Sequence, residues 1–592
     1  MDIPINNHFL FRHNLLLNFI YMIKHMLCKA ILGLLFVMIP IIGYSQDIPL
    51  PSEAQLRWQK YEQIMFLCLD PCTWQGREYD NHSYPISKIN PKQLDTDQWC
   101  KVAKSWDAKM ILFVAKHAGG FCWWQTNTTE YGIKNTSWRN GNGDVLRDLS
   151  ESCKKYGLDL GIYVYPGDEQ WGAGIGSGGK TEDPTKQEAY NKIYRQQLTE
   201  VLTKYGPIKE VWFDGNCHVP INDILEKYAS DAVILQSKKA NIRWVGNEDG
   251  IAPNPNWYMV NKKDLDTGIS TALHSDVNGD CYAPVEVDVP MLKNNAHKWF
   301  WAPNTDHLLL SVEQLMNLYY KSVGRGAVLL LNSTPDTTGL IPVSHVKRYA
   351  EFGKEIKKRF AHPIKKTSGN TQELILDLGK PTVVNHCILQ EQLEKGQRVT
   401  SYTIEGLDKD DKWILLSKGT SIGNKKIDYF PNVSVSQVRL RIQSSKSIPQ
   451  ISNFAVYQVE SDLSDILAMN NLEKPIVISS WEKDTYSEEE WTDVVFDLTP
   501  YVNSIGHYDI VFNLLAGDYI TRQPTGLQFK DWKLEMYGKE FPEGITKLEG
   551  KNVFRITRSQ QTLDEFPTRL RMKIKRNPAK STGEVTIQRI VY

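Results

Sequence analysis

The feature that most constrains the fold is a series of short apolar segments that alternates with amphipathic segments between about residues 52 and 358. Most of the apolar segments are almost continuously hydrophobic, as parallel strands covered on both faces are. Amphipathic segments such as 143–156 and 186–205 carry apolar residues at three- and four-residue spacing, which indicates helices. The predicted strands are 64–69, 110–115, 158–164, 210–213, 232–236, 243–245 and 327–331.

Seven such strands, with one more not recognised, over about 300 residues predict a (β/α)8 barrel of the TIM type. A doubly wound open sheet is the alternative. It is less favoured because no glycine-rich phosphate-binding loop follows the first strand.

Length and charge narrow the class of protein further. The chain has 592 residues, which suggests three or four folding units, and its 69 Lys plus Arg balance its 69 Asp plus Glu. This balance argues against a nucleic-acid partner. The 17 Trp and 27 Tyr suggest aromatic platforms of the kind that stack on sugar rings. The spacing of Cys and His predicts no metal site, and nothing predicts a cofactor.

Residues 1–45 are predicted to be a signal peptide. An apolar run at 30–44 follows Lys24 and Lys29, and small residues precede a cleavage point before Gln46. The run is shorter than the roughly 20 residues that a membrane span needs and contains a proline, although an uncleaved anchor stays possible. We therefore expect a periplasmic or secreted protein without a stable membrane span after cleavage.

Polar and aromatic residues recur directly after the predicted barrel strands. They include His117 after the second strand, Tyr165 after the third, Asp214 after the fourth and Glu248 after the sixth. Catalytic residues of barrels lie at the carboxyl ends of the strands. Surface loops are also polar, but this alternative does not explain why the polarity recurs at one end of each strand.

Asp214 is the first candidate for a catalytic carboxylate. It follows an apolar strand and precedes Gly215, which leaves room for a substrate to approach. Glycoside hydrolysis uses two such carboxyl groups, one on each side of the bond that is cleaved. The alternative is that Asp214 only ends its strand and caps the next turn.

The segment 209–216 (KEVWFDGN) resembles the nucleophile strand of the α-L-fucosidases of glycoside hydrolase family 29. The resemblance extends over about residues 55–350. The sequences of segments 119–126 and 285–288 resemble those of the branch of the family that prefers α-1,3 and α-1,4 fucosyl linkages. The other similar segments are 115–126, 131–138, 141–145, 243–250, 284–288 and 327–332.

The resemblance implies a retaining hydrolase that removes terminal fucose from fucosylated oligosaccharides or glycoconjugates. Asp214 would be the nucleophile and Glu286 the general acid/base, with Glu248 as the alternative acid. His117 would contact sugar hydroxyls. The two carboxyl groups would cooperate in a double displacement.

Aromatic residues are further candidates for the sugar site. The resemblance places Trp299 against the apolar face of the sugar, although a core role is equally compatible with its neighbours. Trp124 and Trp138 are candidates for lining the pocket. Tyr165 is preferred over Tyr163 because the polar turn that follows suggests that the strand ends between them.

The first strand departs from the family pattern. Members usually carry a histidine where this chain reads 66–70 (FLCLD), so a hydrogen bond in the pocket is missing or supplied differently. Glu78, in a segment that still matches, remains a candidate sugar ligand. The change leaves open a related galacto-configured sugar, or a barrel that binds glycans without catalysis.

After the predicted barrel domain, residues 46–362, the pattern changes to alternating strands without helices. Residues 363–460 resemble a discoidin-like, galactose-binding-type β-sandwich, for which a bracing role is favoured over sugar binding. Residues 461–592 are predicted to form a C-terminal β-sandwich module.

Overall fold

The computed structural model describes residues 48–292, 299–460 and 475–589, the last range with short gaps. The predicted signal peptide lies outside the described residues. The gaps are 483–484, 503–505, 517–518, 522–526, 537–538, 541–543, 549–551, 559–566 and 577–581.

Eight parallel strands form a nearly closed barrel, which confirms the predicted fold class. A single backbone bridge between Leu235 and Ile242 links the two edges of the sheet. The strands in barrel order are β1 (Gln63–Leu67), β2 (Met110–Lys116), β3 (Asp159–Val164), β4 (Ile208–Trp212), β5 (Val233–Leu235), β6 (Arg243–Trp244), β9 (Val285–Val289) and β10 (Val328–Ser333).

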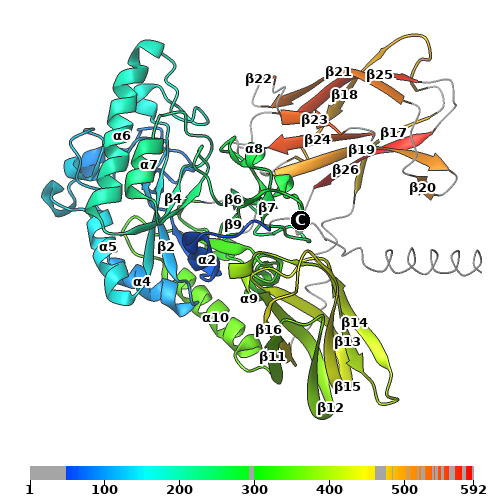
Figure 1. Cartoon of the computed structure of the whole chain (residues 1–592). Helices are drawn as coiled ribbons and strands as arrows, with labels where there is room; N and C mark the ends of the chain where they lie inside the picture. Colours follow the sequence, from blue (N-terminus) through cyan, green and yellow to red (C-terminus); the bar gives the residue numbers. More distant parts are fainter. Residues whose placement is uncertain are drawn as a thin grey trace, which may run out of the picture. The chain divides into compact units, whose positions relative to one another are not determined.

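Helices cover the outside of these strands, as Figure 1 shows for α4 to α7. A short hairpin of β7 (Met259–Val260) and β8 (Cys281–Tyr282) is inserted between β6 and β9. The helices are α2 (Glu53–Gln59), α3 (Cys72–Gln75), α4 (Thr96–Ser105), α5 (Val145–Tyr156), α6 (Gln187–Lys204), α7 (Asn222–Tyr228), α8 (Lys262–Leu265), α9 (Val312–Lys321) and α10 (Val343–Phe360).

Helix α5 illustrates how local sequence sets an element. Asp144 caps its first turn by accepting a hydrogen bond from the Arg147 amide, and Gly157 ends it with a φ of 65°, a conformation that glycine adopts without strain. Leu146 and Leu149 lie on one face and are fully buried against the barrel. The predicted range 143–156 is therefore nearly that of the observed helix.

Strand β9 is the strand that the apolar pattern did not reveal. Its sequence, VEVDV, alternates apolar and acidic residues, which is typical of a strand with one face in water. Both carboxyl side chains, Glu286 and Asp288, are instead buried inside the barrel, 0% and 3% exposed. Strand β9 therefore has two buried faces, one apolar and one acidic, and the alternation in its sequence reflects this difference.

The strands after the barrel form a six-stranded antiparallel sheet with its own core around Tyr402 and Phe454. Its strands in sheet order are β11 (Lys365–Gly369), β16 (Ile451–Tyr457), β12 (Glu373–Glu391), β15 (Lys426–Ser445), β13 (Val399–Leu407) and β14 (Trp413–Gly419).

Buried hydrogen bonds join this sheet to the barrel. The Asn424 side-chain amide donates to the Gln59 carbonyl at 2.9 Å, and the Gln397 amide donates to the Asn256 carbonyl at 3.0 Å. Satisfied polar contacts of this kind fix the position of one element against another. They support the bracing role that the sequence favours for this part of the chain.

The remaining strands form two antiparallel sheets that share one hydrophobic core, as in a β-sandwich. Trp481, 2% exposed, belongs to this core. The first sheet holds β17 (Ile476–Trp481), β26 (Gly583–Arg589), β19 (Gly506–Ala516), β24 (Val553–Arg558) and β23 (Ile545–Lys547), with β20 (Tyr519–Thr521) beside β19. The second holds β18 (Thr492–Asp497), β25 (Arg569–Arg576), β21 (Leu527–Met536) and β22 (Lys539–Glu540). No helix in the described part of the chain is both long and apolar enough to cross a membrane.

Candidate active site

Asp214 projects from the carboxyl end of β4. Phe213 before it is buried, whereas Asp214 is exposed and has a φ of 50°, a left-handed conformation that aspartate tolerates better than most residues. Gly215 follows with a φ of 100°, which only glycine adopts readily. This turn points the carboxylate out of the strand, and the Tyr163 hydroxyl donates a 2.7 Å hydrogen bond to its Oδ2.

The surroundings of Asp214 change its acidity. Desolvation by the surrounding protein raises the pKa of this carboxyl to about 6, the hydrogen bond from Tyr163 acts in the opposite direction, and the charge of Glu248 raises it further. The side chain remains accessible in spite of these neighbours. Asp214 is thus an accessible carboxylate with a raised pKa.

Glu248 lies in the loop after β6 and is half-buried. The Trp299 indole N–H donates to its Oε2 at 3.3 Å. The charge of Glu248 raises the pKa of Asp214, and also that of the Tyr79 hydroxyl. Since electrostatic influence of this kind falls off with distance, Glu248 belongs to the same site as Asp214.

Glu286 occupies a different environment. Its side chain is 0% exposed, and the Trp212 indole N–H donates a 2.6 Å hydrogen bond to its Oε2. Burial and the neighbouring Glu210 raise its pKa well above the usual range. A general acid must reach the oxygen of the leaving group. The burial of Glu286 therefore argues against the acid/base role predicted for it.

His117, predicted to contact sugar hydroxyls, follows β2 and is 7% exposed among aromatic rings. Its imidazole stacks on Tyr79 with centroids 5.9 Å apart and meets Phe300 at 5.0 Å. Tyr163 and Tyr165 lie about as close on another side. Burial lowers the pKa of His117 to about 4, so the ring is neutral at physiological pH and can donate one hydrogen bond and accept another.

The altered first strand places a carboxyl group behind His117. Asp70, fully buried, has its Oδ2 4.0 Å from the His117 Nδ1. Burial, and secondarily the charge of Asp80, raise the pKa of Asp70 well above its usual value. Asp70 is thus an acidic residue that follows the first strand and is buried behind the site.

Trp299 and Glu78 meet each other at the site. The Trp299 backbone N–H donates to the Glu78 Oε2 at 2.8 Å, and the Asn332 amide donates to the Trp299 carbonyl at 3.0 Å. The Trp299 ring packs against Phe66 with centroids 5.7 Å apart and stays half-buried. These contacts leave part of the indole accessible, as a ring that stacks on a sugar must be.

Trp124 and Trp138 do not lie where the sequence predicts. Trp124 is 0% exposed, and its indole donates to the Glu200 Oε2 at 3.0 Å. Trp138 is 3% exposed and lies under the Arg139 guanidinium, 4.3 Å from its ring centroid. Both indoles are core residues that expose too little surface to line a pocket, which corrects the prediction.

Tyr163 and Tyr165 stack on each other, with ring centroids 6.4 Å apart and an interplanar angle of 16°. Strand β3 ends at Val164, between the two tyrosines, as the sequence predicts. The Tyr165 hydroxyl accepts a hydrogen bond from the Gly176 amide at 2.7 Å. Tyr163, and not Tyr165, contacts Asp214 directly. The sequence, which favoured Tyr165 as the pocket residue, did not predict this contact.

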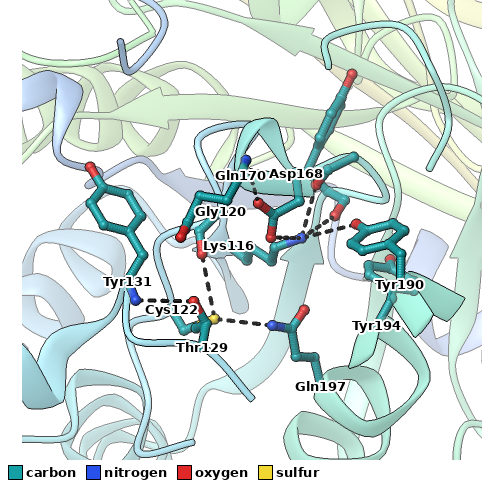
Figure 2. A network of polar contacts seen from close by, with 12 residues as sticks. Lys116, Gly120, Cys122, Thr129, Tyr131, Asp168, Gln170, Tyr190, Tyr194 and Gln197 are labelled. Atoms are coloured by element: carbon teal, nitrogen blue, oxygen red, sulfur yellow. Dashed lines mark hydrogen bonds and ion pairs between the residues drawn. The ribbon is translucent and has the colours of Figure 1, made fainter. Parts of the chain in front are cut away.

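A buried ion pair supports the segment that carries His117 (Figure 2). The Lys116 ammonium lies 3.4 Å from the Asp168 Oδ2 and donates to the Gly167 carbonyl at 2.8 Å, next to the rings of Tyr190 and Tyr194. The loop after β2 is thereby tied to the loop after β3. A Cβ on Gly120 would lie 2.4 Å from the Asp168 Oδ1, so this close approach requires glycine.

Comparisons with known proteins agree with this architecture. A family model described as alpha-L-fucosidase matches residues 56–359, and a model of the F5/8 type C domain matches residues 355–455. The chain belongs to the alpha-L-fucosidase family. Alpha-L-fucosidase 1 of Arabidopsis thaliana is 30% identical over 459 residues, which cover 69% of this chain and 88% of the relative.

Solved structures extend the likeness. A Bacteroides thetaiotaomicron protein is 33% identical with a TM-score of 0.64, covering 70% of this chain and all of the other. A glycoside hydrolase family 29 member from a rumen bacterium is 25% identical with a TM-score of 0.62 and covers 92% of this chain and 100% of its own. A Ruminococcus gnavus family 29 fucosidase, solved in complex with fucose, is 25% identical with a TM-score of 0.62, covering 71% of this chain and 96% of its own. The chain is therefore a glycoside hydrolase, an alpha-L-fucosidase.

Proposed function

We propose that the chain is a retaining, exo-acting α-L-fucosidase in which Asp214 is the nucleophile and Glu248 the general acid/base. The observation that carries this proposal is the exposed Asp214 carboxylate, whose pKa the charge of Glu248 raises. Glu248 is half-buried at the same site, whereas Glu286 has no exposed surface. This pairing replaces the Asp214 and Glu286 pair predicted from the sequence.

In the first step, Asp214 attacks the anomeric carbon while Glu248 protonates the departing oxygen, which leaves a fucosyl ester on Asp214. In the second step, Glu248 deprotonates a water molecule that displaces the ester. Asp214 must be ionised at the start, and Glu248 must be protonated. The Trp299 indole N–H that donates to Glu248 orients this carboxyl group for both steps.

The remaining predicted ligands fit supporting roles. Neutral His117 would hydrogen-bond sugar hydroxyls, and the accessible part of the Trp299 ring would stack on the apolar face of fucose. Glu78 holds the Trp299 backbone, and Tyr165 packs against His117. We propose terminal α-1,3- or α-1,4-linked fucose as the substrate because segments 119–126 and 285–288 resemble that branch of the family.

The experiment compares the chain from Gln46 with Asp214→Ala, Glu248→Ala and Glu286→Ala on an aryl α-L-fucoside with added azide. Azide intercepts a covalent intermediate when the acid/base is missing and replaces the nucleophile when that is missing. We expect α-L-fucosyl azide from Glu248→Ala and β-L-fucosyl azide from Asp214→Ala. An α-azide from Glu286→Ala instead would transfer the acid/base role to Glu286.

Linkage is tested separately with the parent chain. We expect faster release of fucose from an α-1,3/4-fucosylated oligosaccharide than from an α-1,2-fucosylated one of equal size. The opposite order would contradict the linkage proposal and leave the catalytic pair untouched. We also propose export through the signal peptide at residues 1–45, which cell fractionation tests.

A further inference from the structure

Two glutamates face each other inside the barrel below the site. Glu210 on β4 and Glu286 on β9 are both 0% exposed, and their carboxyl groups interact directly. Each also accepts an indole hydrogen bond. Trp58 donates to the Glu210 Oε2 at 2.8 Å, and Trp212 donates to the Glu286 Oε2 at 2.6 Å.

Two carboxylates this close cannot both ionise in a dry interior, so the pair holds a proton between them. The protonated group donates to the other, and Glu286 keeps an oxygen as the acceptor for Trp212. Desolvation raises the pKa of Glu210 to about 7 and that of Glu286 well above its usual range. Burial also raises the pKa of Asp288, which lies on the same strand as Glu286.

A chain of contacts leads from the pair to the nucleophile. The Trp212 ring stacks on Tyr163 with centroids 5.4 Å apart and planes 25° apart, and Phe66 packs against both rings. The Tyr163 hydroxyl donates to Asp214 at 2.7 Å. The position of the hydroxyl therefore depends on the Trp212 ring, which Glu286 holds through its indole N–H.

We propose that Glu286, together with Glu210, is a positioning pair that fixes the Trp212 indole and, through the stacked Tyr163 ring, aligns the hydroxyl that hydrogen-bonds Asp214. The proposal rests on Asp214 as the nucleophile and assigns a role to two carboxyl groups that the double displacement does not use. Neither group reaches the substrate, because neither has exposed surface.

The pH dependence follows from the groups around Asp214. Glu248 raises its pKa and Tyr163 lowers it, and the other titratable neighbours that sense the Asp214 charge are Cys68, Tyr79 and Tyr165. Among these groups in the described part of the chain, only the Tyr163 hydroxyl donates a hydrogen bond to Asp214. If that hydroxyl moves away, the acidic limb of kcat/KM moves to higher pH.

The test compares Glu286→Gln with Glu286→Leu. The glutamine oxygen can still accept from Trp212 and its amide can donate to Glu210, so we expect kcat/KM within about 3-fold of the parent at its optimum. Leucine removes the acceptor. We expect the acidic limb to move to higher pH by about one unit, and kcat/KM at pH 6 to fall about 5-fold as a result.

Trp212→Phe provides the second variant, since it keeps a ring against Tyr163 but loses the indole N–H. We expect the same direction of shift in the acidic limb. We also expect the double variant Glu286→Leu, Trp212→Phe to be no worse than Glu286→Leu alone, because both changes break one contact. Melting temperatures of all variants check folding, and Trp212→Phe decides the question if Glu286→Leu does not fold.

A general acid at position 286 predicts a different pattern. Glu286→Gln would then be as defective as Glu286→Leu on an oligosaccharide, an aryl fucoside with a good leaving group would be spared, and azide would restore turnover. That pattern, or an acidic limb that stays in place in Glu286→Leu and Trp212→Phe, overturns the positioning role. Activity that survives in Asp214→Ala would instead refute the proposed nucleophile, so the two failures are distinguishable.

Discussion

Replacing Tyr163 with phenylalanine removes one hydroxyl and keeps the ring that packs on Trp212 and Tyr165. The hydroxyl donates a 2.7 Å hydrogen bond to the Asp214 Oδ2, and this bond favours the ionised carboxylate. Without it, desolvation by the surrounding protein and the charge of Glu248 act unopposed. The pKa of Asp214 therefore rises from its present value of about 6.

The size of the rise follows from the energy of the bond. A hydrogen bond to a charged group contributes about 1.5–3 kcal/mol, and one pKa unit corresponds to about 1.4 kcal/mol. The carboxyl is exposed, so solvent screening favours the lower value, which gives a rise of about one unit. At pH 6 the ionised fraction of Asp214 would fall from about one half to about one tenth.

The sign of the effect on activity is fixed by the chemistry. The nucleophile must be ionised, so activity is lost as pH falls through the Asp214 pKa, and raising this pKa moves the loss to higher pH. We expect kcat/KM of Tyr163→Phe to drop about 5-fold at pH 6 and to change little above about pH 8.

The assay is the pH profile of kcat/KM on an aryl α-L-fucoside, with Tyr165→Phe as the matched control. The Tyr165 hydroxyl accepts a hydrogen bond from the Gly176 amide and, among the described residues, makes none to Asp214, so the control should keep the acidic limb of the parent. An acidic limb that stays in place in Tyr163→Phe, or moves to lower pH, would refute the reasoning. Equal shifts in both variants would show that packing, not the hydroxyl, sets the pKa.

Further predictions concern stability and binding. Because the folded pKa of Glu210 is raised to about 7 from 4.5, its contribution to stability is present below pH 4.5 and lost as pH rises through 7. Glu210→Gln should therefore gain up to about 3 kcal/mol over the parent in urea unfolding at pH 8, and much less at pH 5. Lys116→Met should cost about 3–5 kcal/mol because it leaves the buried Asp168 unpaired, which a lowered melting temperature would show. Trp138→Ala should lower the melting temperature and leave KM unchanged, whereas Trp299→Ala should raise KM with little change in melting.

The barrel could be predicted from the sequence because most of its strands are nearly continuous apolar runs. The eighth, β9, could not, because its acidic residues are buried and the alternation of apolar and polar residues does not distinguish a buried carboxyl from an exposed one. The same ambiguity affected the site. Glu248 follows a predicted strand and Glu286 lies in the strand that was not recognised, and it is burial that separates the two carboxyl groups.

The sequence located Asp214, because the strand before it is apolar and the glycine after it marks a turn. It did not reveal the partner of Asp214. Tyr163 lies on β3 and Tyr165 directly follows the end of the strand, where the sequence predicts that end. The hydrogen bond to Asp214 nevertheless comes from Tyr163, because a side-chain contact between neighbouring strands is not visible in the sequence pattern.

The abundance of tryptophan has a different explanation from the one that composition suggests. Trp58, Trp124, Trp212 and Trp244 each donate an indole hydrogen bond to a carboxyl group, at 2.6–3.0 Å. A buried carboxyl needs donors, and an indole supplies one while filling the interior with apolar surface. The acceptors of these four bonds are Glu210, Glu200, Glu286 and Asp288.

Burial separates the carboxyl groups by role, since Glu248 at the site also accepts an indole hydrogen bond. Three of the groups that accept from an indole, Glu210, Glu286 and Asp288, lie inside the barrel with raised pKa values, held away from water. Asp214 is bonded by a tyrosine hydroxyl and stays accessible. A barrel rich in acidic residues can thus keep a reactive carboxylate at its rim, because the acidic residues inside it are neutralised by burial and positioned by indoles.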